Sequence, residues 1–194
     1  MTDNSVPIRA EIERLEQELM EQRRRLSALR KELPDALVDD HILHGPDGAH
    51  HLSDLFGEHA DLIVIHNMGS DCRHCTMWAD GFNGLLPYFR SRAVFVVVSC
   101  DRPEIQREFA DSKGWNFPMY SDESGEFTRA MGFLREWQGK LGLWPGVSTF
   151  HRSPDGSIRR VAFANFGPHD EYCPVWNIFD LLHDGVGDWQ PTLA

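Results

Sequence analysis

Hydrophobic residues recur at alternating spacings of three and four over residues 7–33. Glu and Arg fill most of the positions between them, which is the pattern of an amphipathic helix with a heptad seam. Pro34 is expected to end this helix, because proline disfavours helical geometry at the residue before it. The seam positions are Ile12, Leu15, Leu19, Gln22, Leu26, Leu29 and Leu33.

Two interpretations of this helix stay open, because about three heptads are too few to decide between them. The helix either lies on the surface of the chain's own globular domain or pairs with a second copy, with polar Gln22 setting the register. We therefore expect an N-terminal helical arm over residues 1–34 and a globular domain over 35–194. The second interpretation adds a homodimer formed through the helix.

Beyond the arm, short apolar runs alternate with helical patterns. A hairpin turning at residues 45–48 comes first, followed by a turn capped by Ser53. The runs at 61–66, 93–99, 117–120, 147–151 and 158–164 predict strands, and helices are expected at 75–89, 103–114, 125–131 and 172–183. Because the strand runs are uninterruptedly apolar, both faces of the sheet should be covered. This order predicts an α/β, thioredoxin-like fold with a mixed central sheet flanked by helices.

Composition and charge narrow the class of protein. The 194 residues are 41% hydrophobic and 25% charged, which is ordinary for one globular domain. A net charge of -11 argues against nucleic acid as a partner. The first residues lack the apolar stretch of a signal peptide and no apolar run approaches about 18 residues, so we expect neither export nor a membrane partner. A cytoplasmic location follows, where the four cysteines would rest reduced.

The most informative feature is the pair Cys72 and Cys75, which follows an apolar strand and precedes a helix. The first turn of a helix offers unpaired N–H groups and the positive end of the helix dipole, which favour a thiolate. A Cys-x-x-Cys spacing in this setting is typical of a thioredoxin-like redox site, whereas a structural zinc site would need a second pair. We expect Cys72 to be the nucleophile and Cys75 to resolve the mixed disulfide.

Neighbouring side chains could tune this pair. Arg73 and His74 lie between the cysteines, where positive charge would lower a thiol pKa and make the couple more oxidising than the roughly -270 mV of thioredoxin. The alternative is that both simply point to solvent. Trp78, one turn after Cys75, would shield the resolving sulfur. Asp80 could act as a buried proton acceptor for the second thiol, although helix capping or solvent contact is the more ordinary use.

Other cysteines and histidines are candidate ligands or further thiols. Cys100 ends a valine-rich strand and Cys173 precedes a proline near the C-terminus, and we expect both to be inert. A dithiolate with imidazoles would suit copper or zinc, but no close histidine pair completes four ligands, so no metal and no cofactor are expected. The histidines nearest the motif or in the preceding hairpin are His44, His50, His51, His66 and His74.

Over residues 55–167 the chain resembles a thioredoxin-like family of predicted dithiol-disulfide oxidoreductases, a domain-of-unknown-function family. The matching stretches are 61–68, 72–75, 78–84 and 114–121, of which Trp78–Gly84 is the most specific. The resemblance implies a thioredoxin fold with the dithiol as its site and no established substrate. Residues 117–132 are also similar to a core segment of peroxiredoxins, which implies a peroxide as an alternative substrate. Peroxiredoxins place Thr or Ser three residues before the attacking cysteine, whereas here Gly69 precedes Cys72 at that spacing.

The chain departs from thioredoxins at one further position. Thioredoxins carry a cis-proline opposite the dithiol, and the equivalent residue here is expected to be Ser148. The absence of proline at this position weighs against ordinary disulfide exchange and leaves room for a metal at the dithiol. The predicted function is thiol-disulfide exchange with a thiol or disulfide partner through Cys72 and Cys75. The alternatives are a thiol-dependent peroxidase and a non-catalytic metal-binding or protein-binding module.

Overall fold

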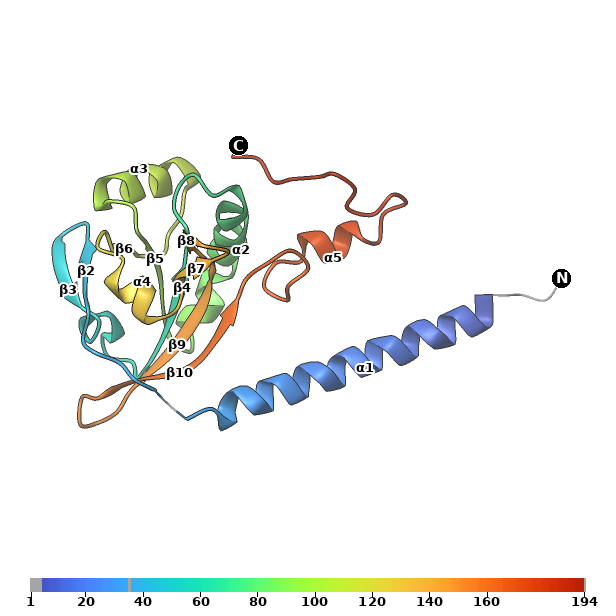
Figure 1. The fold of residues 1–194 in the computed structure, drawn as a ribbon, viewed down its shortest axis with the longest axis horizontal. Coiled ribbons are helices and arrows are strands. Elements are labelled where there is room, and N and C mark those ends of the chain that lie inside the picture. The colour runs from blue at the N-terminus through green and yellow to red at the C-terminus, as the bar shows by residue number, and fades with distance from the viewer. Residues whose placement is uncertain (1–4, 35, 194) are drawn as a thin grey trace. The chain divides into compact units, whose positions relative to one another are not determined.

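The chain forms two units in the computed structural model, which describes residues 5–34 and 36–193. The first unit consists of one helix, α1 (Ser5–Glu32), in which no described residue is buried. This confirms the predicted helix. The second unit begins at Ala36 and contains every other described helix and strand (Figure 1).

Within residues 36–193, one mixed sheet has eight strands in the order β1-β10-β9-β4-β5-β6-β2-β3. The central strands β4, β5 and β6 are parallel, while β9 runs antiparallel to β4 and β10 antiparallel to β9. The strands are β1 (Ala36–Leu37), β2 (Ile42–Gly45), β3 (Gly48–His51), β4 (Asp61–His66), β5 (Val94–Ser99), β6 (Met119–Ser121), β9 (Gly146–Arg152) and β10 (Ile158–Asn165). The 3-10 helix η1 (Asp54–Phe56) follows β3. The α-helices are α2 (Arg73–Arg90), α3 (Pro103–Lys113), α4 (Glu126–Ala130) and α5 (Val175–Phe179).

Side chains alternate between the two faces of the central strands and build one apolar cluster on each face. Ile65 and Val97 point to the face covered by α2, where they join Trp78 and Phe82. The opposite face carries Leu62, Val64, Val96 and Val98, which pack with Phe127 of α4, with Phe133 and with Phe150. The prediction of a sheet covered on both faces is therefore confirmed.

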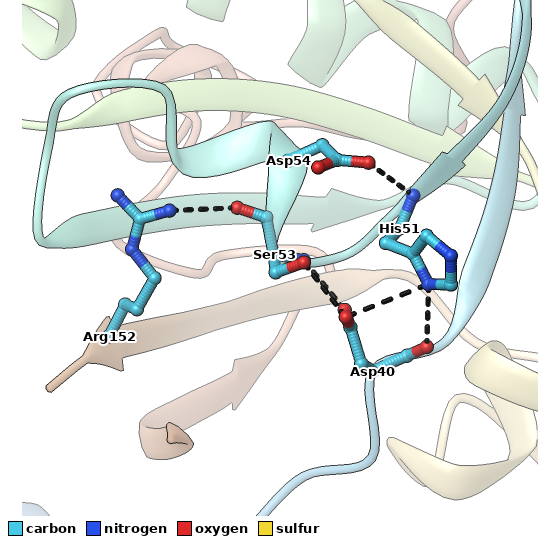
Figure 2. Close-up of polar contacts among 5 residues, drawn as sticks. All are labelled: Asp40, His51, Ser53, Asp54 and Arg152. Atoms are coloured by element: carbon cyan, nitrogen blue, oxygen red, sulfur yellow. Dashed lines mark hydrogen bonds and ion pairs between the residues drawn. The ribbon is translucent and has the colours of Figure 1, made fainter. Parts of the chain in front are cut away.

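The turn after β3 is tied to its neighbours by five polar side chains (Figure 2). The Ser53 N–H and hydroxyl both donate to the Asp40 carboxylate at 2.8 Å, and the His51 N–H donates to Asp54 at 2.9 Å. Arg152 donates to the Ser53 carbonyl at 3.0 Å. The predicted turn is therefore confirmed as η1 with Ser53 at its N-cap position, but the Ser53 side chain makes no capping hydrogen bond, because its hydroxyl donates to Asp40.

A small hairpin and one short edge strand were missed from the sequence. A separate hairpin joins β7 (Leu134–Trp137) to β8 (Lys140–Leu143) through Gln138 and Gly139, whose φ angles are 50° and 74°. Two consecutive positive φ values are typical of the tight turns of two-residue hairpins. Gln at the first turn position hides this signal, because Asn or Asp is the usual residue there. The other missed strand is the two-residue β1, which pairs with the edge of β10.

The predicted helix over 172–183 is much shorter in the structure. Only α5 (Val175–Phe179) is α-helical there, and Pro174 lies at its N-cap. The Asp170 carboxylate accepts hydrogen bonds from the N–H groups of Tyr172 at 2.8 Å and Cys173 at 3.0 Å. An aspartate side chain that binds backbone N–H groups two and three residues ahead favours a turn over a helix.

Candidate redox site at the start of α2

The loop between β4 and α2 is held rigidly by polar contacts. The Asn67 N–H donates to the Val98 carbonyl near the end of β5, and the Asn67 side chain accepts the Gly69 N–H at 2.8 Å. The Ser70 N–H donates to the Asp101 carboxylate at 2.7 Å. Gly69 has a φ of 114°, and a Cβ there would lie 2.9 Å from the Asp101 carboxylate oxygen, so this position requires glycine. The loop therefore delivers the next residues to α2 in one defined geometry.

Cys72 and Cys75 lie together at the N-terminus of α2. Cys72 is the N-cap residue, and its sulfur accepts the Cys75 N–H at 3.1 Å. The Cys75 sulfur accepts the Met68 N–H at 3.5 Å from the preceding loop. Cys72 is half-buried while Cys75 is only 3% exposed, and both are free thiols. The structure thus places one accessible and one buried sulfur at the helix end.

The two thiols have opposite pKa shifts. The pKa of Cys72 is lowered to about 7, mainly by a hydrogen bond from the Cys75 thiol and also by the backbone N–H groups of Cys75 and His74, against the effect of burial. The pKa of Cys75 is raised, first by its hydrogen bond to Cys72, then by burial and by the negative charge on Cys72. Of the two sulfurs, Cys72 therefore ionises first, while Cys75 keeps its proton.

The side chains between the cysteines contribute less than the sequence suggested. Arg73 is exposed, and His74 stacks on Trp176 with ring centroids 5.8 Å apart and an interplanar angle of 8°. The lowered pKa of Cys72 arises from Cys75 and from backbone N–H groups, including that of His74, rather than from a charge on either side chain. The Cys75 thiol and, to a smaller extent, backbone N–H groups at the helix end thus provide the stabilisation that was expected from Arg73 and His74.

Trp78 is buried one turn after Cys75 and connects α2 to the C-terminal segment. Its indole N–H donates to Asp170 at 3.5 Å, and its ring lies 5.6 Å from that of Trp176. Asp170 was not singled out from the sequence, although it joins Trp78 to the turn before Cys173. A lone aspartate in a polar stretch gives no sequence signal for such a role.

Asp80 is exposed, and its carboxylate accepts the indole N–H of Trp115 at 2.7 Å. It is therefore not a buried carboxylate, and no hydrogen bond joins it to Cys72 or Cys75. Asp101, also missed from the sequence, is the carboxylate that anchors the loop before Cys72. Its place directly after β5 could have indicated it, because side chains at the carboxyl ends of neighbouring parallel strands meet at one sheet edge.

Ser148 lies on the sheet face opposite α2. It pairs with Val64 across β9 and β4, and its hydroxyl hydrogen-bonds His66 Nε2 at 2.9 Å. His66 is fully buried and stacks on Phe133 with ring centroids 4.0 Å apart. The residue of β9 that pairs with His66, at the end of β4 nearest the dithiol, is Gly146 rather than Ser148.

The remaining cysteines and histidines are distributed over the molecule. Cys100 is half-buried beside Thr128, and Cys173 is buried in the apolar cluster of α2. His50 pairs with Asp47 at 2.7 Å. Within residues 5–34 and 36–193, no three His, Cys, Asp or Glu side chains form a group able to hold a metal ion. No helix in the same residues is both long and apolar enough to cross a membrane.

Residues 8–191 match the sequence profile of a family described as bacterial protein of unknown function (DUF899). No curated protein matches the sequence significantly. Among solved structures, the chain is similar to the peroxidoxin BcpB of Mycobacterium tuberculosis, with 25% identity, a TM-score of 0.55 and coverage of 68% of this chain and 84% of that one. The bacterioferritin comigratory protein of Xanthomonas campestris matches with 28% identity, a TM-score of 0.53 and coverage of 65% and 80%.

PrxQ of Xylella fastidiosa has a TM-score of 0.56 at 22% identity and covers 68% of this chain and 84% of its own. These neighbours establish the thioredoxin-like fold, and they confirm both the predicted fold class and the similarity to peroxiredoxins.

Proposed function

We propose that this chain, which belongs to the DUF899 family, is a thiol-disulfide oxidoreductase that works through Cys72 and Cys75. Its partner would be a protein or small molecule that carries a thiol or a disulfide. The proposal goes further than the general thiol redox chemistry suggested by the fold neighbours, because it assigns a role to each cysteine.

The observation that carries the proposal is that the two sulfurs differ in exposure and in pKa. Cys72 is accessible, accepts the Cys75 N–H at 3.1 Å and has a pKa lowered to about 7. About half of it is therefore ionised at neutral pH, and the thiolate is the form that attacks disulfides. Cys75 is buried and keeps its proton until Cys72 has reacted. This order of reactivity is what a two-step exchange requires.

The exchange proceeds in two substitutions. The Cys72 thiolate attacks one sulfur of a substrate disulfide, forms a mixed disulfide and expels the other sulfur as a thiolate that takes up a proton. Cys75 then loses its proton and attacks the Cys72 sulfur, which releases the second substrate thiolate. The substrate gains two electrons, and the enzyme ends with a Cys72–Cys75 disulfide. The reverse sequence oxidises a dithiol.

The test treats the Cys75→Ser and Cys72→Ser variants with oxidised glutathione, which forms mixed disulfides with reactive thiolates. Cys75→Ser should retain one glutathione per chain as a stable adduct on Cys72, whereas Cys72→Ser should retain none. Intact-protein mass spectrometry measures the adduct. Cys100→Ser serves as the matched control and should behave as the wild type. A wild-type protein that never forms the Cys72–Cys75 disulfide in oxidising glutathione buffer contradicts the proposal.

A thiol peroxidase is the second candidate, and the solved structures favour it. The bacterioferritin comigratory protein of Xanthomonas campestris, which is 28% identical to this chain, is described as having alkyl peroxide reduction activity. Here the Cys72 thiolate would attack a peroxide oxygen, release an alcohol or water and become a sulfenic acid. Cys75 would attack the Cys72 sulfur, expel water and form the same disulfide. Gly69 supplies no hydroxyl three residues before Cys72, which weighs against this candidate.

The two candidate functions predict different products on Cys72 of the Cys75→Ser variant. A peroxidase variant treated with cumene hydroperoxide should gain a dimedone-reactive sulfenic acid on Cys72 within seconds at micromolar peroxide. An exchange enzyme should react slowly with the peroxide but quickly with a disulfide. The ratio of the two second-order rate constants, measured on the same variant, decides between them.

A further inference from the structure

The helix α1 presents an apolar stripe that it cannot bury by itself. Its seam residues Ile12, Leu15, Leu19, Leu26 and Leu29 are each between 45% and 60% exposed. With 28 residues at about 1.5 Å per residue, the helix is roughly 42 Å long, so the stripe spans several turns. A contiguous exposed apolar face of this kind marks an interaction surface.

The charges of α1 are divided between its two halves. Residues 11–21 carry five glutamates and one arginine, whereas residues 23–31 carry four arginines, one lysine and no acidic residue. Uncharged Gln22 separates the halves. The helix dipole does not explain this division, because the dipole acts within the first and last turns and the first turn of α1 has no acidic residue. The acidic half also extends to Glu21, near the middle of the helix.

We infer that α1 pairs with α1 of a second copy of the chain as an antiparallel two-helix coiled coil. Reversing one helix brings the acidic half of each copy against the basic half of the other. The register that centres the pair sets Ile12 against the partner's Leu29 and Leu15 against the partner's Leu26. Both apolar stripes are then covered along their length.

Charges beside the seam are complementary in this arrangement. Glu16 lies opposite the partner's Arg23, and Glu18 lies opposite the partner's Arg25, so each pair occurs twice by symmetry. The outermost pairs, Glu11 with the partner's Glu32 and Arg9 with the partner's Arg30, carry like charges and offset part of this attraction. The central charges therefore favour the antiparallel orientation, while burial of the two apolar stripes drives association.

A parallel pair is disfavoured by the same residues. In a parallel pair, each residue at a g position of the heptad lies beside the e residue five positions later in the other copy. Glu11 would then face the partner's Glu16, and Arg25 would face the partner's Arg30, so only Glu18 with the partner's Arg23 is attractive. The acidic halves of the two copies would also lie side by side, as would the basic halves, so like charges would repel along both.

The first test is the mass of the full-length protein by sedimentation equilibrium. The wild type should sediment at twice the chain mass of 22.2 kDa, and Leu19→Glu on the seam should reduce it to one chain. Met20→Glu is the matched control, because Met20 is 48% exposed, has similar size and lies off the seam. A monomeric wild type, a dimeric Leu19→Glu variant or equal disruption by Met20→Glu would each overturn the inference.

The second test determines helix direction in a background in which Cys72 and Cys75 are replaced by Ala. Ile12→Cys and Leu29→Cys variants are mixed and oxidised, and the crosslinked peptides are identified by mass spectrometry. The antiparallel pair should give the crosslink between residue 12 of one copy and residue 29 of the other. Crosslinks between identical positions would show a parallel pair and overturn the orientation.

Discussion

Cys75 donates its backbone N–H to the sulfur of Cys72 over 3.1 Å, so the buried cysteine of the pair stabilises the thiolate of the accessible one. The hydrogen bond between the two side chains acts in the same direction and is the largest cause of the lowered Cys72 pKa. The reactive sulfur therefore depends on its neighbour in two ways, through the backbone geometry of α2 and through the Cys75 proton. These two contributions can be separated by substitution.

The rate of Cys72 alkylation should follow its lowered pKa. The thiolate fraction of Cys72 rises as pH rises through about 7, so the rate with iodoacetamide should be half-maximal near that pH. Cys75→Ala removes the side-chain hydrogen bond and should move the midpoint upward, toward the ordinary thiol range of about 8.5. Cys75→Ser keeps a hydroxyl donor and should move it less. An unchanged midpoint in Cys75→Ala would show that the backbone alone sets the pKa.

Substitution of Gly69 should destabilise the loop before the dithiol. Gly69→Ala places a Cβ at a φ of 114° and 2.9 Å from Asp101, so we expect the free energy of unfolding to fall by about 1–3 kcal/mol. Gly84→Ala is the control, because Gly84 lies inside α2 with no atom within 4 Å of its Cβ position. That change should be neutral or stabilising by up to about 1 kcal/mol. Urea denaturation measures both, and equal effects would contradict the strain at Gly69.

Asp170 should control the segment that packs on Trp78. Its carboxylate accepts the N–H groups of Gly167 and Cys173 and the Trp78 indole N–H. Asp170→Ala leaves these donors without their acceptor, with an expected cost of about 1–3 kcal/mol. Hydrogen exchange should accelerate over residues 167–176 while β4 and β5 stay protected. Asp180→Ala, which removes an exposed contact with the His169 ring, should leave that exchange pattern unchanged.

His66 should make the protein sensitive to mild acid. Burial, with the nearby positive charge of Arg160, holds the pKa of His66 well below 6.5, so the native protein keeps it neutral. Below pH 6.5 the unfolded chain binds a proton at this residue that the native state does not, and stability is lost as pH falls. Between pH 7.5 and 5.5 this contribution is about 1.4 kcal/mol.

His66→Phe should remove that part of the pH dependence, because the ring can still stack on Phe127 and Phe133. Urea denaturation at the two pH values measures the difference between variant and wild type. His183→Phe is the control, since His183 is 99% exposed and its loss should leave the difference unchanged. A wild-type pH dependence retained in His66→Phe would contradict the neutral, buried state of this histidine.

Local patterns in the sequence were sufficient for most of the elements. The heptad spacing predicted α1, the apolar runs predicted β4 and β5, and Pro103 marked the start of α3, because each signal depends on side chains close in the chain. The spacing of Cys72 and Cys75 after a strand also indicated the candidate site. The predicted terminal helix failed, because Asp170 and Pro174 impose a turn that periodicity alone does not reveal.

Only the tertiary structure decided which groups surround the two sulfurs. Asp101 and Asp170 reach the site from distant parts of the chain, and neither stands out locally because a single aspartate has many uses on a protein surface. Sheet register decided that the Ser148 hydroxyl turns to the face away from α2, since adjacent strand residues point to opposite faces. The sequence by itself determined the fold class and the pair of cysteines. Three-dimensional packing determined which sulfur is accessible, which keeps the proton and what holds each in place.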